Sequence, residues 1–428
     1  MCGACLAVGM PAWLLLTVMA GCSLPRGGPV KIEFSPDGTN VAYLWEDRLE
    51  EPVVDGRIWC RTISLHWCKT SAPEKESSTS VETLGTQFAG CLNVPLEIKW
   101  SPHGHRIGVL TPHRLTLVEA GSQNKKTLED RTITSFTWLS DDEVAYCTRR
   151  TWKGMQSRVI ICRQKLDDGQ AKTVAGFDWH PASKYTWKEH WAPSGQYVIF
   201  MEPDIGGRFH VVDVLGGASR AFGQTNACDI GVAWDPESSR AFCVSRKVGP
   251  WDVFEAVLLY PVTGNVVDCT PGFQGRFAGH MPNLIPIWTV DGKYVLVNAL
   301  DISGHLVRPD PWEAVPLGQS LAHAFKAPKD STIAPWLFRL PVGGWVGVIP
   351  TGNEGNSPVK YAADYLGHSV IPLLEDYRRA ISPDGTMAAT IGEDGRIKIR
   401  SLGKWWLPSA KSHESMPDSS PAPRGAAQ

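Results

Sequence analysis

Short apolar runs separated by polar turns recur along most of the chain. The first run, NVAYLW, follows the phrase Phe34-Ser-Pro-Asp-Gly38, and the last, MAATIG, follows Ile381-Ser-Pro-Asp-Gly385. Each phrase starts with a large apolar residue and ends in a turn. Short apolar runs bounded by turn residues are typical of β-strands. The pattern predicts an all-β chain built from hairpins.

The phrase recurs between these two copies. Further copies lie at Trp100–Gly104, Trp138–Asp142, Trp191–Gly195, Trp234–Ser238 and Trp288–Gly292, and an eroded one at Arg339–Gly343. The average spacing of about 50 residues suits a four-stranded blade. We therefore predict a β-propeller of four-stranded blades over residues 30–408, with eight blades expected and seven as the alternative.

The turn residues have a physical role in this pattern. Proline fixes φ for the second position of a type I turn, short polar side chains bond the local backbone, and glycine takes the left-handed position that closes the hairpin. We expect structural roles for Pro36, Asp37, Gly38, Pro102, Gly104, Pro193, Gly195, Pro236, Asp291, Gly292, Pro383, Asp384 and Gly385.

These phrases resemble the WD40-like repeats of the TolB-type propeller family, whose hallmark is an FSPDG turn followed by an apolar strand. The resemblance implies a closed ring over residues 30–408. The last unit supplies GRIKIRSL without a clear fourth strand, so PVKIE at residues 29–33 is a candidate for that place. Residues 48–58, 69–93 and the Pro-rich 301–335 are expected to form long loops.

The amino-terminal segment has a different character. Residues 6–21 carry no charge and fit the apolar region of a signal peptide. The sequence Met19-Ala-Gly-Cys22-Ser23 resembles the lipobox of bacterial lipoproteins, although Met19 stands where leucine is usual and residues 1–21 lack lysine and arginine. A plain secretory signal or an uncleaved anchor are the alternatives.

The lipobox resemblance implies a division of the termini. Residues 1–21 would be the signal peptide, Cys22 the lipidated residue, and residues 22–29 the tether. Ser23 favours the outer membrane, on its periplasmic side. Residues 409–428 are low in complexity and are expected to be disordered.

Composition narrows the function. Lys and Arg number 42 against 44 Asp and Glu, a balance that gives no indication of nucleic-acid binding. We find no phosphate loop, nucleophile elbow, cofactor signature or metal-ligand spacing, so no catalytic residue, cofactor or metal is predicted. His103 and His105 are interpreted as turn residues.

Cysteine and tryptophan supply the remaining candidates. Export would permit disulfides, and Cys147 with Cys162 and Cys228 with Cys243 are candidate pairs, with buried free thiols as the alternative. The chain has 18 tryptophans. Five outside the repeated position are candidates for a binding surface or for packing between blades: Trp152, Trp179, Trp187, Trp251 and Trp312.

The sequence therefore favours a non-enzymatic lipoprotein of the cell envelope whose propeller is a scaffold for a partner protein. Two other classes stay open. One is a propeller enzyme with a site at the channel mouth, of lyase or glycosidase type. The other is a module that binds a glycan or small ligand.

Overall fold

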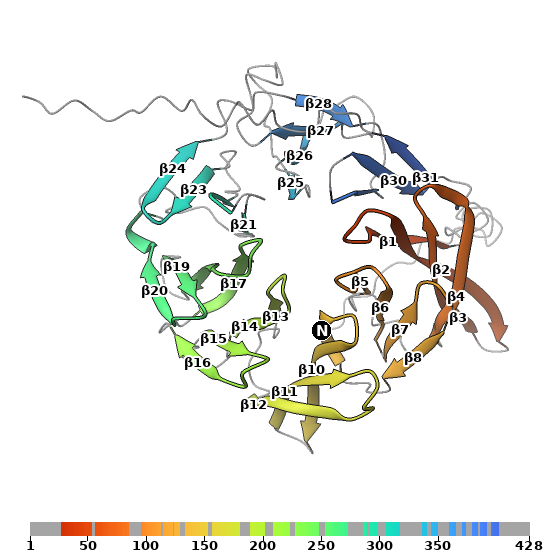
Figure 1. The fold of residues 1–428 in the computed structure, drawn as a ribbon, viewed down its shortest axis with the longest axis horizontal. Coiled ribbons are helices and arrows are strands. Elements are labelled where there is room, and N and C mark those ends of the chain that lie inside the picture. The colour runs from red at the N-terminus through yellow and green to blue at the C-terminus, as the bar shows by residue number, and fades with distance from the viewer. Residues whose placement is uncertain are drawn as a thin grey trace, which may run out of the picture.

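The computed structural model shows β-sheets arranged side by side in a ring (Figure 1). It describes residues 27–53, 56–84, 96–112, 114–122, 124–128, 133–152, 156–179, 189–201, 209–222, 227–247, 253–272, 286–288, 292–297, 305–316, 336–339, 344–349, 359–364, 370–373, 379–383, 386–391 and 395–401.

Each sheet contains consecutive antiparallel strands. The first holds β1 (Gly27–Phe34), β2 (Asn40–Val53), β3 (Gly56–Lys69) and β4 (Ala72–Leu84). The second holds β5 (Glu97–Trp100), β6 (Arg106–Leu110), β7 (Leu115–Glu119) and β8 (Lys125–Leu128). The third holds β9 (Ile133–Ser140), β10 (Glu143–Trp152), β11 (Gln156–Lys165) and β12 (Ala171–Trp179). The fourth holds β13 (Glu189–Trp191), β14 (Tyr197–Met201), β15 (Phe209–Asp213) and β16 (Ser219–Phe222).

The second half of the chain repeats this order. The fifth sheet holds β17 (Ala227–Trp234), β18 (Ala241–Lys247), β19 (Val253–Tyr260) and β20 (Asn265–Asp268). The sixth holds β21 (Ile287–Trp288), β22 (Val295–Val297), β23 (His305–Pro309) and β24 (Trp312–Pro316). The seventh holds β25 (Trp336–Arg339), β26 (Gly344–Ile349), β27 (Val359–Asp364) and β28 (Val370–Leu373). The eighth holds β29 (Arg379–Ile381), β30 (Met387–Ile391) and β31 (Ile397–Ser401).

The predicted class is confirmed: the chain is an all-β propeller of antiparallel, mostly four-stranded blades. The sheets seen among the described residues fit the eight-bladed count. Four expectations about local structure were wrong. Residues 48–53 and 56–58 belong to β2 and β3, and residues 72–84 form β4, because pairing between these strands satisfies backbone groups that a loop would leave to water. Within the expected loop 301–335, β23 and β24 pair with each other.

The fourth wrong expectation concerns ring closure. Residues 29–33 lie in β1, which pairs with β2 as the innermost strand of the first sheet and not with the last sheet. The register explains the choice, since Phe34 pairs with Val41 directly across the Ser-Pro-Asp-Gly turn. A hairpin closed by a short turn brings together neighbouring segments, whereas joining the last sheet would have required a long-range pairing.

The repeated turn has the predicted geometry wherever glycine is described. Gly38, Gly104, Gly195 and Gly292 have φ values of 71°, 74°, 73° and 67°. In the first three, the glycine N–H donates to the carbonyl three residues earlier at 2.9 Å. Asp291, Asp384 and Gly385 lie outside the described residues.

Two copies of the phrase have no glycine at the last position, and their turns differ from each other. Ser238 adopts φ 61°, and its N–H donates to Asp235 O at 3.0 Å, so the same turn is kept with a non-glycine residue. In the third copy Glu143 pairs with Ser140 across a shorter turn. Asp142 therefore does not have to adopt the left-handed conformation, with positive φ, that glycine adopts in the other copies.

The residue before the turn proline anchors the hairpin. The hydroxyls of the fully buried Ser35, Ser101 and Ser382 accept hydrogen bonds from the N–H groups of Asn40, Arg106 and Met387 at 2.9, 3.0 and 2.9 Å. These bonds satisfy backbone N–H groups at the point where the hydrogen bonding between the two paired strands ends.

The tryptophans of the phrase connect neighbouring blades. The Nε1–H groups of Trp100, Trp138, Trp234 and Trp288 donate to the carbonyls of Glu33, Lys99, His190 and Ala233 at 3.2, 3.0, 2.9 and 2.8 Å. Each acceptor is on the inner strand of the preceding blade, one residue before that blade's own aromatic. Trp191 donates instead to Ser135 Oγ at 2.9 Å. We call these bonds the indole ladder.

Buried side chains fill the space between adjacent sheets. Ala42, Leu44 and Ile63 of the first sheet pack with Ile98 and Ile107 of the second, all with 1% exposure or less. Between the eighth and first sheets, Phe34 and Tyr43 pack with Ala389, Ile391 and Ile397. We call this joint the seam. The phenyl ring of Phe34 has no N–H to donate, so the indole ladder does not continue across the seam.

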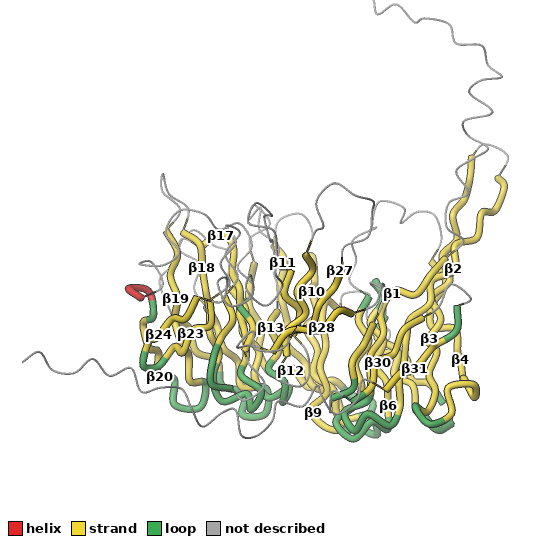
Figure 2. Tube along the Cα trace, turned by 90° about the horizontal axis from the view of Figure 1, so that it is seen from above, coloured by secondary structure: helices red, strands yellow, loops and turns green. Residues whose placement is uncertain are grey.

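Strand ends define two faces of the ring. The turns that join the first to second and third to fourth strands gather at one face, and the ribbon of β2 and β3 projects from the other (Figure 2). The amino-terminal end of β1 lies at the base of this ribbon, since Gly27 pairs with Asp47.

Candidate functional site

Charged side chains line the inner strands of the first two blades. Lys31 Nζ lies 3.0 Å from Glu33 Oε1 on β1, and Lys99 Nζ lies 3.3 Å from Glu97 Oε2 on β5. These residues alternate with Ile32 and Ile98, which pack into the cores. Because side chains on a strand alternate between faces, the charges occupy the opposite face of each strand from those core residues.

Burial perturbs one of these carboxylates. Desolvation raises the pKa of Glu33 above its ordinary value, and the nearby Lys31 and Lys99 ammonium groups counteract only part of that effect. Lys99 Nζ also donates to Phe136 O at 2.5 Å and lies 5.0 Å from the Phe136 ring centroid. The inner-strand charges therefore join the first three blades.

A second partly buried carboxylate lies between the third and fourth blades. Glu189 Oε1 accepts a hydrogen bond from Thr134 Oγ1 at 2.6 Å. Desolvation raises the pKa of Glu189, while the hydrogen bond to Thr134 lowers it by less. Carboxyls with raised pKa can act as general acids, and such groups cluster at functional sites. Here, however, Glu189 is used in a contact between blades.

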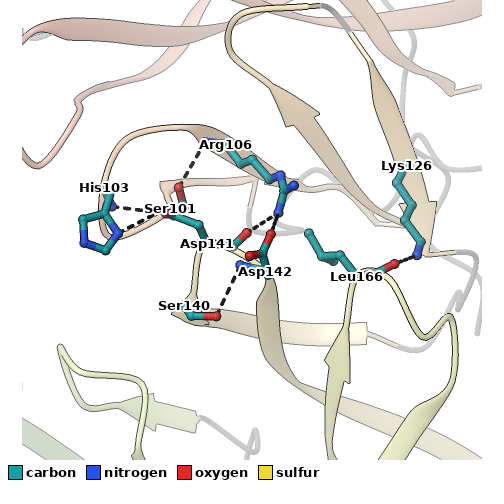
Figure 3. A network of polar contacts seen from close by, with 8 residues as sticks. All are labelled: Ser101, His103, Arg106, Lys126, Ser140, Asp141, Asp142 and Leu166. Atoms are coloured by element: carbon teal, nitrogen blue, oxygen red, sulfur yellow. Dashed lines mark hydrogen bonds and ion pairs between the residues drawn. The ribbon is translucent and has the colours of Figure 1, made fainter.

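A polar network joins the second and third blades at the turn face (Figure 3). His103 Nδ1 lies 2.9 Å from Asp141 Oδ2, and the His103 N–H donates to Asp141 Oδ1 at 3.2 Å. Arg106 Nη1 donates to Asp141 O at 2.6 Å and contacts Asp142. Asp141 and Asp142, which occupy the last two positions of the phrase, thus hold the preceding blade's turn.

Another network lies at the seam. Ser64 Oγ is 3.0 Å from His66 Nε2, and His66 Nδ1 is 2.6 Å from Glu76 Oε1. This order of bonds is that of a serine hydrolase triad. The hydroxyl of Tyr43 lies 2.9 Å from the same Glu76 oxygen and 3.3 Å from Gly395 O of the eighth blade, and the Tyr43 and His66 rings stack at 4.8 Å. We interpret this network as a structural contact that joins the eighth and first sheets at the seam.

The predicted disulfides are wrong for the described cysteines. Cys147 and Cys162 are buried free thiols, and so is Cys243, whose predicted partner was Cys228. Cys147 pairs with Ile161 and Cys162 with Tyr146, so the two thiols point to opposite faces of the third blade. Burial raises the pKa of Cys147 and Cys243. These thiols serve as small apolar core residues.

The candidate surface tryptophans divide into three groups. Trp312 lies in β24 and packs, half-buried, against the core between the fifth and sixth blades, so of its two predicted roles the structure favours packing between blades over a binding surface. Trp152 and Trp179 end β10 and β12 at the same end of the third blade, since Trp152 pairs with Gln156 and Trp179 with the adjacent Ser157. Trp187, Trp251 and Cys22 lie outside the described residues.

Sequence reasoning missed the inner-strand charges and the seam network. Lys31, Glu33, Glu97 and Lys99 immediately precede the repeated phrase in two consecutive units, which is the signal that could have found them. In the described parts of the chain, no group of three or more His, Cys, Asp and Glu is placed to hold a metal ion. The described residues also include no helix of the length and apolarity needed to cross a bilayer.

Comparison with known proteins supports the fold. The Dos1 propeller superposes with a TM-score of 0.52 at 11% identity, over 88% of this chain and 93% of that one. TolB from Acinetobacter baumannii matches with a TM-score of 0.34 at 13% identity, over 80% of this chain and 82% of that one.

A dipeptidyl peptidase is also similar. Dipeptidyl peptidase 4 from Porphyromonas gingivalis matches with a TM-score of 0.47 at 10% identity, over 72% of this chain. The matched part is 53% of that enzyme, so this chain spans about half its length. No family profile matches the chain, and no curated protein matches it by sequence. At 11% identity, the likeness to the Dos1 propeller shows the fold alone.

Proposed function

We propose that this chain is a lipid-anchored propeller of the bacterial cell envelope that binds a partner protein and has no catalytic activity of its own. The observation that carries the proposal is the ribbon of β2 and β3, which projects beyond the other described strands (Figure 2). Elements that extend from a rigid ring are suited to contact other molecules.

Among the described strands, none pairs with the outer part of the ribbon along either of its backbone edges. Pairing of β2 with β1 stops at Asp47, and pairing of β3 with β4 stops at Arg61. The pairs from Leu49–Cys60 to Val53–Gly56 therefore lie beyond both flanking strands, over about 17 Å. Open strand edges offer N–H and C=O groups to an incoming strand.

The proposed anchor lies near the same face. Cys22 precedes Gly27 by five residues, which span at most about 18 Å. Since Gly27 lies at the base of the ribbon, a lipid on Cys22 would hold the ribbon face toward the outer membrane. A lipoprotein cysteine carries more than one acyl chain, as stable anchoring requires.

A pull-down from detergent-solubilised envelope tests the binding role. We expect a partner to be retained by the wild-type chain and lost when residues 49–60 are replaced by an Asn-Gly turn. Leu215→Glu, a change at an exposed residue of the opposite face, is the matched control and should retain the partner. Equal recovery with the shortened ribbon would remove the main support for the proposal.

Palmitate labelling tests the anchor. Labelling should be present in the wild-type chain and absent in Cys22→Ala. Label that persists in this variant would contradict the lipid anchor while leaving the binding role intact.

A fluorophosphonate probe tests the absence of catalysis. The probe labels activated serines, and Ser64 is the serine in a triad-like set of bonds. We expect no labelling of the folded chain. Labelling that disappears in Ser64→Ala would show a hydrolase and contradict the scaffold role.

A further inference from the structure

The eighth sheet lacks an outer strand among the described residues. Every other sheet has four strands, whereas the eighth ends at β31. The sequence segment that was a candidate for this place, residues 29–33, is used in the first sheet. β30 pairs with one edge of β31, and no described strand pairs with the other edge, whose alternate N–H and C=O groups therefore have no partner strand among the described residues.

The two faces of β31 differ in chemistry. Ile397 and Ile399 pack against the seam core. Lys398 and Arg400 alternate with them and are exposed. The described residues include no carboxylate ion pair with Lys398 or Arg400. A strand added at this edge would place side chains beside the two isoleucines on one face and beside the two cations on the other.

We infer that the outer edge of β31 binds an extended segment of a partner protein, in which acidic residues alternate with β-branched apolar ones, as the fourth strand of the eighth blade. The backbone ladder supplies affinity in this mode, and the alternating side chains supply specificity. Acidic side chains oppose Lys398 and Arg400, while the apolar ones continue the core begun by Ile397 and Ile399.

This inference names a partner's chemistry and rests on the binding role proposed above. Its test is independent of the envelope pull-down, because it uses a synthetic peptide and acts at a site remote in sequence from the ribbon. Failure of peptide binding would reject the β31 site and leave a ribbon-dependent partner standing. Failure of the pull-down alone would reject the ribbon proposal.

Fluorescence anisotropy provides the measurement. The probe is a labelled peptide, Glu-Val-Asp-Ile-Glu-Val, with blocked ends, and the protein is the full chain purified in detergent. Lys398→Glu with Arg400→Glu should weaken binding by about tenfold or more, because like charges would then face each other across the strands. A second peptide, with lysine at the acidic positions, should bind the wild-type chain no more tightly than the acidic peptide binds the double variant.

A matched control separates the site from general charge. Lys172 is an exposed lysine on β12, the outer strand of the complete third sheet. Lys172→Glu should change peptide affinity less than about twofold. Hydrogen exchange gives a readout that does not depend on variants: saturating peptide should slow exchange of amides within residues 397–401 of the wild-type chain.

Besides failure of the peptide to bind, three outcomes would overturn the inference. The first is equal loss of affinity in the Lys172→Glu control and in the Lys398→Glu/Arg400→Glu variant. The second is unchanged exchange at residues 397–401 under saturating peptide. The third is binding that appears only after the chain is shortened to end at Ser401, which would assign the edge to the chain's own carboxyl-terminal segment.

Discussion

Replacing Trp288 with phenylalanine isolates one bond of the indole ladder. Trp288 is 1% exposed, and its Nε1–H donates to Ala233 O at 2.8 Å within the core between the fifth and sixth blades. Phenylalanine keeps an aromatic ring at this position but removes the donor. The Ala233 carbonyl would then be buried without that hydrogen bond.

The loss of stability can be estimated from the two changes. A buried acceptor left unsatisfied costs about 1–3 kcal/mol. The smaller ring leaves a void of roughly methyl size or larger, which costs about 1 kcal/mol. We therefore expect Trp288→Phe to lower the free energy of unfolding by about 2–4 kcal/mol. The Arg240 guanidinium, 4.7 Å from the indole centroid, would still face an aromatic ring.

Guanidinium chloride unfolding followed by circular dichroism provides the assay, with the slope compared alongside the midpoint. Trp191→Phe is the matched control, because its indole donates to the Ser135 hydroxyl, which can rotate to another acceptor. That variant should lose only about 0.5–1.5 kcal/mol. If Trp191→Phe is the more destabilising, the ladder does not support the ring as argued.

Three other predictions concern the turns, a buried carboxylate and the thiols. A Cβ on Gly195 would lie 2.4 Å from Trp138 O at φ 73°, so Gly195→Ala should lose about 3 kcal/mol or more in chemical unfolding. Gly169→Ala, with a similar φ but open space, should lose about 1–2 kcal/mol. Because burial raises the folded-state pKa of Glu189, its stabilising contribution is full below the ordinary value of 4.5 and is lost as pH rises through the folded pKa. Glu189→Gln should therefore unfold at higher denaturant than wild type at pH 7, with the difference disappearing below pH 4.5; a constant difference would refute this. Burial raises the pKa of Cys68 to about 12, so its alkylation by iodoacetamide at pH 8 should be slow until the chain unfolds.

The fold was largely predictable because one local pattern carried it. The Ser-Pro-x-Gly phrase specifies a short turn between two apolar strands, and this information lies within about a dozen residues. Ring closure was less predictable, because residues 29–33 could pair either with the neighbouring β2 or with the distant last sheet, and the spacing of the phrase does not decide between them. The register of β10 and β11 places Cys147 and Cys162 on opposite faces of the sheet. The sequence could not predict this register, because a shift of one residue moves every side chain of a strand to the other face.

The candidate site was less predictable for a different reason. Lys31, Glu33, Glu97 and Lys99 look like ordinary surface charges when each is read alone. Only the radial stacking of sheets brings β1 beside β5 and β5 beside β9, and so gives these charges neighbours from other blades. Trp312 shows the same limit, since the sequence left a binding surface and packing between blades open, and only its place in β24 against the core decides for packing.

Closure without strand exchange also bears on how such a ring can change in evolution. Each sheet is formed by one contiguous stretch of chain, and no described strand pairs across the seam. Duplication or deletion of one stretch of about 50 residues would therefore add or remove a whole blade without re-pairing any other strand. The unequal spacing of the phrase, and its eroded copy at Arg339–Gly343, are consistent with units that have diverged independently within such a ring.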